Sequence, residues 1–79
     1  MEFTIVDQNG KRIDSIILSI SISSTGQLQY DVATSNGIAI KQHTFPSKAA
    51  IDLMPGILSS LSWAKNYYKD PYLKLIFSS

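Results

Sequence analysis

The chain has no cysteine, which excludes disulfides, thiolate chemistry and cysteine-based zinc sites. Charged residues make up only 16% of it, and seven basic residues stand against six acidic ones. This balance lacks the basic excess that is typical of nucleic-acid-binding domains. The chain also has no apolar run of about 18 residues that could span a bilayer, and no N-terminal signal-peptide pattern. We therefore expect a cytoplasmic protein without a membrane segment.

Motifs for catalysis are also missing. His43 is the only histidine, and no nucleophile elbow of the form G-x-S-x-G occurs. The carboxylates are scattered, and none is paired as general acid–base catalysis requires. The glycines stand singly, so there is no phosphate-binding loop, and one histidine is a poor basis for a transition-metal site. We expect no enzymatic activity, cofactor or metal, and we interpret His43 as a polar residue on the solvated face of a strand.

What the sequence does contain is a series of short, alternating segments typical of β-strands. Asn9-Gly10 and Asn36-Gly37 are strong hairpin signals, because both residue types tolerate positive φ. Short links between alternating segments predict an antiparallel meander with one solvated face. The predicted strands cover residues 2–7, 12–23, 27–34, 38–45 and 72–77.

The second segment, 12–23, is the clearest strand, with isoleucine and leucine on one face and serine on the other. Ile13 and Ile17 fall on the serine face, and the segment is long for a single strand. We therefore expect a bend or bulge near Ile16-Ile17, with Ile13 and Ile17 covered by something other than the main core. Residues 16–23 also combine high β propensity with no charge. If they lie at a sheet edge, another chain can add to them.

One segment, 47–69, is long and periodic enough to be a substantial helix. Ser47 is a candidate N-cap, and Lys69-Asp70-Pro71 ends the segment. Pro55-Gly56 interrupts it, so either one helix is kinked there or a short helix is followed by one that starts at Pro55. Steps of four and three predict an apolar stripe, which consists of Ala50, Met54, Ile57, Leu61, Ala64 and Tyr68.

The predicted order is therefore β-β-β-β-α-β. The apolar stripe of the kinked or broken helix covers the apolar face of the antiparallel sheet, which gives an α+β fold of two layers. With 79 residues, the chain predicts a single small domain over 1–79, near the lower size limit for unaided folding.

Trp63 is the most informative single residue. It lies about 200° from Leu61 around the helix axis, on the side opposite the stripe. Small residues surround it there, and tryptophan and tyrosine are enriched among interface hot spots. The alternative is that Trp63 packs internally, under a loop or after a rotation of the helix at Pro55. The predicted partner-binding residues are Trp63, Tyr67, Gly56, Ser59 and Ser60.

Aromatic and basic residues also permit a nucleic-acid hypothesis, since single-strand binders combine stacking rings with cations on a sheet face. A meander of four strands followed by a helix is broadly similar to the architecture of Whirly-type single-strand binders, an analogy of fold alone. The nearly neutral charge disfavours this hypothesis. The nucleic-acid-binding residues in this alternative are Lys41, His43, Phe45, Tyr72 and Lys74.

The leading hypothesis is a non-catalytic protein-interaction module, such as a small adaptor, accessory subunit or inhibitor. Its size and lack of catalytic motifs fit accessory proteins of phages or mobile elements. We expect it to contact a protein partner, or a second copy in a homodimer, through the outer helix face or an exposed sheet edge. The identity of the partner does not follow from the sequence.

Overall fold

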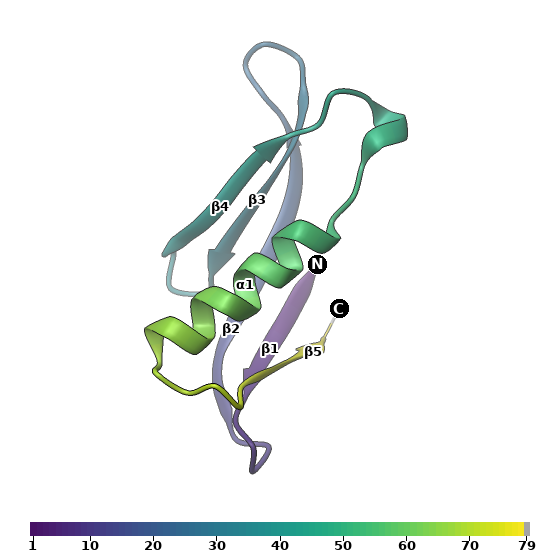
Figure 1. Ribbon diagram of the computed structural model, residues 1–79. Helices are drawn as coiled ribbons and strands as arrows, with labels where there is room; N and C mark the ends of the chain where they lie inside the picture. Colours follow the sequence, from purple (N-terminus) through teal and green to yellow (C-terminus); the bar gives the residue numbers. More distant parts are fainter. Residues whose placement is uncertain (79) are drawn as a thin grey trace.

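The computed structural model describes residues 1–78, in which five strands, one 3₁₀ turn and one α-helix follow one another (Figure 1). The predicted order β-β-β-β-α-β is confirmed. No helix within these residues has the length and apolar character needed to cross a membrane. The elements are β1 (Glu2–Val6), β2 (Arg12–Ile22), β3 (Leu28–Thr34), β4 (Ala39–Thr44), η1 (Lys48–Ala50), α1 (Met54–Tyr67) and β5 (Lys74–Phe77).

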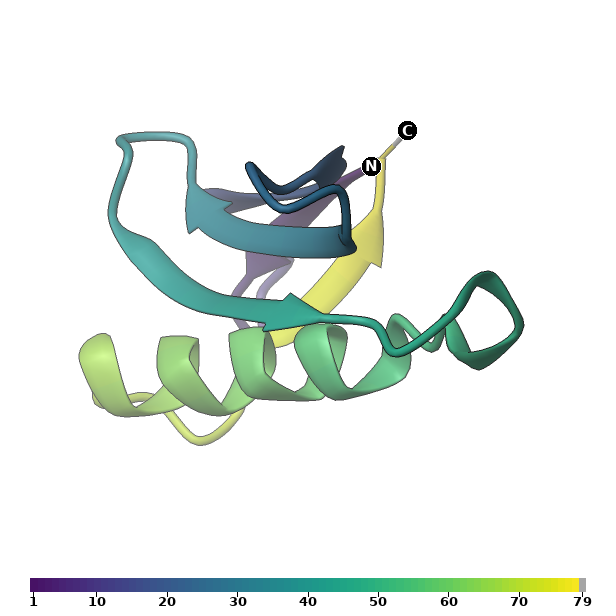
Figure 2. The same cartoon turned by 90° about the horizontal axis from the view of Figure 1, so that it is seen from above.

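The strands form one antiparallel sheet with the order β4-β3-β2-β1-β5. The first four strands make the predicted meander, and β5 then returns beside β1 after the helix. Gly10 and Gly37 hold φ values of 79° and 86° in the two Asn-Gly turns, as the hairpin signals predict. Figure 2 shows α1 lying along one side of the coiled sheet, which confirms the two-layer α+β fold.

The core lies between the sheet and α1. On the other side of the sheet, which we call the open face, the side chains are mainly polar. There Gln42 Nε2 donates to Asp31 Oδ1 (2.7 Å) and Ser21 Oγ donates to Asp31 Oδ2 (3.3 Å). Each fully buried large apolar side chain contributes roughly 2 kcal/mol to the hydrophobic stabilisation. The buried core residues are Phe3, Ile5, Ile16, Leu18, Tyr30, Val32, Phe45, Ala64 and Leu73.

The irregularity predicted in β2 exists, but not at Ile16-Ile17, where pairing with both neighbours is regular. The register of β1 and β2 shifts at Ile13 instead, which is the additional residue of a bulge. This shift turns Ile13 towards the helix side, where it packs against the main core. Ile17 stays exposed on the open face. The expectation that something else covers both residues is therefore wrong.

A second register shift, in β4 at Ile40, corrects the interpretation of His43. Beyond the shift His43 pairs with Tyr30, so its side chain lies on the helix side of the sheet. The two rings are 5.5 Å apart, although His43 is still exposed to solvent. Lys41 lies on the same side, opposite Val32. The expected position of His43 on the solvated open face is wrong, because the additional residue reverses the alternation.

The predicted helical segment 47–69 is divided, as the second of the two alternatives predicts. The turn η1 ends at Ala50, and α1 starts at Met54 with Pro55 in its first turn, where its missing N–H costs nothing. Ser47 precedes η1 and makes no side-chain cap. Asp52 takes over this role for α1, since its Oδ1 accepts a hydrogen bond from the Met54 N–H (3.1 Å).

The C-terminus of α1 lies where Lys69-Asp70-Pro71 predicts it. Lys69 adopts a left-handed conformation with a φ of 53°. Its N–H donates to the Asn66 carbonyl (3.3 Å), and the Asp70 N–H donates to the Lys65 carbonyl (3.0 Å). This is a Schellman motif, in which a left-handed residue lets the chain reverse and satisfies the last carbonyls of the helix.

The predicted stripe is confirmed in part, since Ala64 is buried and Ile57 and Tyr68 pack against the core, but the most buried side of α1 is displaced from it. Its buried residues are Gly56, Ser60 and Ala64, whereas Met54 is exposed, as is Ala50 before the helix. The cause is Tyr30, whose ring is completely buried directly beneath Gly56. Small residues at every fourth position let the helix backbone approach this large ring, and the bulkier residues then pack on either side.

Candidate functional site

Strand β2 extends beyond its neighbour β1, as Figure 1 shows from the β2–β3 hairpin rising past the N-terminus. The pairing of β1 ends at Ile17, and Met1 continues it by one step. The Met1 amino group donates to the Leu18 carbonyl (3.0 Å), and the Leu18 N–H donates to the Met1 carbonyl (2.8 Å). Residues 19–22 pair with β3 alone within the part of the chain that the structure describes. We call residues 19–22 the overhang.

The overhang presents unpaired backbone groups at its free edge. Ser23 N–H donates to the Gln27 carbonyl towards β3 (2.7 Å), whereas both backbone groups of Leu18 are bonded towards β1. Successive residues of a strand direct their N–H and C=O groups to opposite sides. Ile20 and Ile22 therefore share the direction of Leu18 and point their N–H and C=O groups away from β3.

The side chains at this edge are apolar and accessible. Ile20 is 48% exposed, Ile22 is 70% exposed and Met1 is 49% exposed. All three lie in phase with Leu18, on the helix side of the sheet. Ile22 also lines an open pocket of about 300 Å³. No charged side chain occurs between Ser15 and Tyr30, although Lys48 lines the same pocket as Ile22.

The two edge strands of the sheet, β5 and β4, carry features that hinder the addition of a further strand. Strand β5 is only four residues long and begins with the exposed Lys74. Strand β4 carries the register shift at Ile40 followed by Lys41. Short length, lysine and bulges are the features by which proteins protect sheet edges. The overhang is also only four residues long, but its pairing with β3 is regular and it contains no lysine.

Trp63 lies partly buried against the core and not on the outer side of α1. Its ring stacks on that of Tyr67, with centroids 4.7 Å apart and 20° between the planes, and meets Tyr68 edge-on. Tyr67 is 55% exposed. The predicted outer position of Trp63 is thus wrong, and Trp63 packs internally as the alternative proposed. The reason is that the helix turns its small residues towards Tyr30.

The small residues predicted to surround a binding anchor are mostly inside the fold. Gly56 and Ser60 are buried, and Ser60 Oγ donates to the Gly56 carbonyl (2.7 Å). Ser59 is partly buried, and its Oγ accepts a hydrogen bond from Lys41 Nζ (3.4 Å). Among the five predicted contact residues, Tyr67 alone is exposed. The prediction of an accessible surface at Gly56 and Ser60 is wrong.

A buried carboxylate that the sequence interpretation passed over joins three parts of the fold. Asp14 Oδ2 accepts a hydrogen bond from Tyr68 Oη (2.6 Å), and Asp14 Oδ1 accepts from Ser35 Oγ (3.0 Å) and the Ser15 N–H (2.7 Å). Burial raises the pKa of Asp14, but these hydrogen bonds outweigh burial and hold the pKa below its ordinary value. Burial and the bond to Asp14 raise the pKa of Tyr68 to about 12. The cluster fastens the end of α1 to the sheet.

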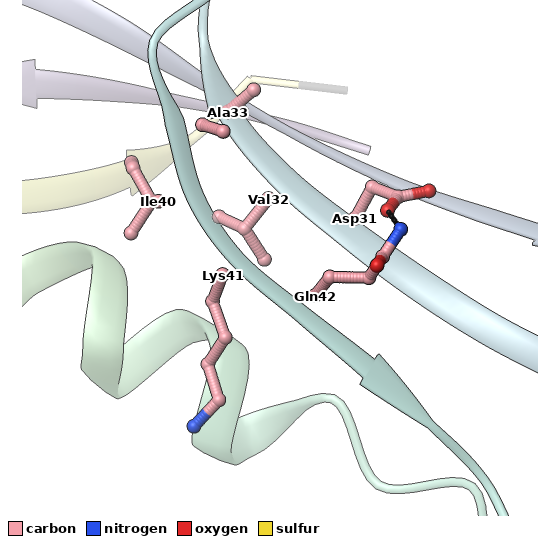
Figure 3. A pocket seen from close by; sticks show the side chains of 7 residues that line it. Asp31, Val32, Ala33, Ile40, Lys41 and Gln42 are labelled. Atoms are coloured by element: carbon pink, nitrogen blue, oxygen red, sulfur yellow. Dashed lines mark hydrogen bonds between the residues drawn. The ribbon is translucent and has the colours of Figure 1, made fainter.

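A shallow pocket of about 410 Å³ lies at the register shift between β3 and β4 (Figure 3). In Figure 3, Lys41 reaches towards α1, while Asp31 and Gln42 bind each other on the other side of the strands. The single carboxylate of this pocket is thus already engaged by an amide. Across residues 1–78, no three His, Cys, Asp or Glu side chains lie close enough together to hold a metal ion.

The residues of the nucleic-acid alternative do not share one surface. Strands β4 and β5 lie at opposite edges of the sheet. Phe45 is buried, with its ring 5.3 Å from that of Tyr30. Lys74 pairs with Val6 and lies on the open face, and Tyr72 is exposed just before β5, whereas Lys41 and His43 lie on the helix side. The expectation of one face with stacking rings and cations is therefore wrong.

No family model, curated protein or solved structure matches the chain.

Proposed function

We propose that this protein is a non-catalytic protein-interaction module, in the manner of a small adaptor, accessory subunit or inhibitor, and that it binds another polypeptide by strand addition at the overhang. One observation carries this proposal. Ile20 and Ile22 combine outward N–H and C=O groups with exposed apolar side chains, in a stretch of β2 without charged residues. In strand addition, main-chain hydrogen bonds supply affinity, and alternate side chains supply specificity.

The energetics favour an occupant for this edge. Burying the exposed parts of the Ile20 and Ile22 side chains would contribute about 2 kcal/mol. Each hydrogen bond to the strand would add about 1 kcal/mol or less, because water already satisfies these groups in the free protein. The cytoplasmic setting predicted from the sequence stays part of the proposal, since a cysteine-free chain suits a reducing compartment. Single-strand nucleic-acid binding is not proposed, because its residues lie on different faces.

Affinity capture with matched variants tests the proposal. The wild-type chain, Ile22→Lys and Ile76→Lys are immobilised and exposed to a lysate of the source cells. Ile76 is also an exposed isoleucine, but it lies on β5 opposite Thr4, on the open face away from the overhang. A polypeptide that binds the wild type and Ile76→Lys, and is lost with Ile22→Lys, supports the proposal.

Amide hydrogen exchange on the captured pair then locates the contact. Strand addition should slow exchange at the Ile20 and Ile22 amides, which point away from β3, and leave the Ser21 amide unchanged because it faces β3. Equal capture by all three chains, or unchanged exchange at Ile20 and Ile22, would contradict the proposal.

A further inference from the structure

We infer that the polypeptide that occupies the overhang is a second copy of this chain, paired antiparallel to the first around Ser21. This inference rests on the proposed function and names the partner for the same edge. It follows from the spacing of the outward backbone groups, from the space that the fold leaves beside β2, and from the composition of the segment.

The spacing of Ile20 and Ile22 makes the edge complementary to itself. Both residues direct N–H and C=O outward, and one residue separates them. In a two-fold antiparallel pair, Ile20 of each copy then lies opposite Ile22 of the other, and each such pair exchanges two hydrogen bonds. Ser21 lies opposite Ser21 of the second copy, in the position without hydrogen bonds. All outward groups of the overhang are satisfied.

The neighbouring chain segments favour this register. Met1 fills the place beside Leu18 at one end of the overhang. At the other end, the chain leaves the strand in a turn, in which the Gly26 N–H donates to the Ser23 carbonyl (2.9 Å). A shift of two residues towards Leu18 would place the second copy where Met1 lies. A shift of one residue would bring side chains of opposite faces together and misalign the backbone groups.

The side chains also match across this axis. A two-fold axis perpendicular to the sheet places the helices of both copies on the same face of the joined sheet. Ile20 and Ile22 of the two copies then form one apolar strip, with Met1 at each end. Residues 16–29 contribute no charged side chains to the contact, and the nearest cations are Lys48, beside Ile22, and the Met1 amino group, beside Leu18. Because the contact is short, its area falls below about 1,200 Å², and we expect a dissociation constant in the micromolar range.

Single cysteines placed in this cysteine-free chain test the register. In the proposed dimer the two Ser21 Cα atoms are about 4.5 Å apart, within the range that a disulfide spans. The two Ser19 Cα atoms are about 14 Å apart, because four residues of strand separate their levels. Both serines are exposed on the open face. Mild oxidation should therefore convert most of Ser21→Cys into covalent dimer and leave Ser19→Cys mainly monomeric.

Sedimentation of the cysteine-free chains provides an independent measurement. The wild type and Ile76→Lys should dimerise at micromolar concentration, and Ile22→Lys should weaken the dimer at least about tenfold. Ile22→Pro is a second variant, because it removes an outward N–H and leaves the bonds of Ser21 and Ser23 to β3 intact. Thermal melts establish that each variant is folded.

Several results would overturn the inference. These are a wild-type chain that stays monomeric up to about 1 mM, equal cross-linking of the Ser19→Cys and Ser21→Cys chains, or loss of the dimer in Ile76→Lys with none in Ile22→Lys. The failure of the dimer is distinguishable from the failure of the proposed function. A monomeric chain that still captures another protein through Ile22 keeps the function and loses the inference, whereas a chain that does neither loses both.

Discussion

Gly56 is the position where the packing of α1 on the sheet can be measured most directly. Alanine is the better helix former by up to about 1 kcal/mol, so Gly56→Ala would stabilise an isolated helix. In this fold, however, a Cβ atom at Gly56 would lie 2.8 Å from Tyr30 Cε2 and 3.3 Å from Val32 Cγ2. Carbon atoms in good contact are about 3.5–4.0 Å apart. The Tyr30 ring cannot move aside easily, because it is fully buried and packs against the rings of His43 and Phe45.

The two effects have different sizes. Forcing an additional methyl group into a packed core costs about 1–3 kcal/mol, which exceeds the gain in helix propensity. We therefore expect Gly56→Ala to lower the free energy of unfolding by about 1 kcal/mol and the melting temperature by about 4–8 °C. Ser62→Ala is the matched control, since Ser62 is exposed on the same helix, and it should raise the free energy of unfolding by up to about 0.5 kcal/mol.

Urea and thermal denaturation followed by circular dichroism measure both variants. A double-mutant cycle with Tyr30→Leu isolates the contact, because the smaller side chain makes room for the methyl group. Gly56→Ala should then cost less in the Tyr30→Leu background than in the wild type. If Gly56→Ala instead raises the melting temperature as much as helix propensity alone predicts, α1 does not pack on Tyr30 in this way.

Three further predictions concern the end of α1. Lys69→Gly should raise the free energy of unfolding by about 0.5 kcal/mol, because glycine adopts the φ of 53° without strain; a lower value in urea denaturation would contradict this reasoning. The pKa of Asp14 is lowered and that of Tyr68 is raised to about 12, so their contributions to stability are complete between about pH 4 and 10. The Asp14 contribution should be lost as the pH falls below 4, and the Tyr68 contribution should be lost as the pH rises from 10 to 12. In a profile of unfolding free energy against pH, Asp14→Asn should therefore flatten the acid limb. Tyr68→Phe should flatten the alkaline limb. Trp63→Ala should lower the free energy of unfolding by about 2–3 kcal/mol, because Trp63 packs against the core. Tyr67→Ala should lower it by less than about 1 kcal/mol, because Tyr67 is 55% exposed. The opposite order in thermal melts would place the tryptophan outside the core.

The strands and turns of this fold could be predicted because their causes are local. Alternating side chains and the two Asn-Gly pairs specify the hairpins without reference to the rest of the chain. The bulges at Ile13 and Ile40 could not be located, since an additional residue is visible only when two strands are aligned. The same limit applies to the overhang. The apolar residues of segment 16–23 indicate a strand, but where β1 ends beside it depends on pairing between distant segments.

The helix shows why periodicity alone placed the candidate site on the wrong side. Large apolar residues dominate a periodicity count, so the predicted stripe ran through Met54 and Leu61. Ala64 of that stripe is buried, but the fold buries Gly56 and Ser60 with it, since a fully buried tyrosine beneath the helix leaves room only for small residues. Their four-residue spacing is visible in the sequence and could have indicated this face.

The cluster around Asp14 shows a different limit of sequence reasoning. Asp14 and Tyr68 meet across most of the chain, and neither residue stands in a recognisable motif. A carboxylate in an alternating strand is normally interpreted as solvent-facing, because burial of an unpaired charge is costly. Only the three-dimensional arrangement shows that the hydroxyl groups of Tyr68 and Ser35 offset that cost.

The pairing of β5 with β1 has a consequence for biosynthesis. Phe3 emerges from the ribosome early, but the strand that contains its neighbour Phe77 is the last of those described here to be made. Until then β1 has a free side, and the Leu73 part of the core is missing. Contacts between such distant segments form slowly, and partly made chains with open strands are prone to aggregate. Until β5 has been made, the first hairpin is therefore open to such aggregation.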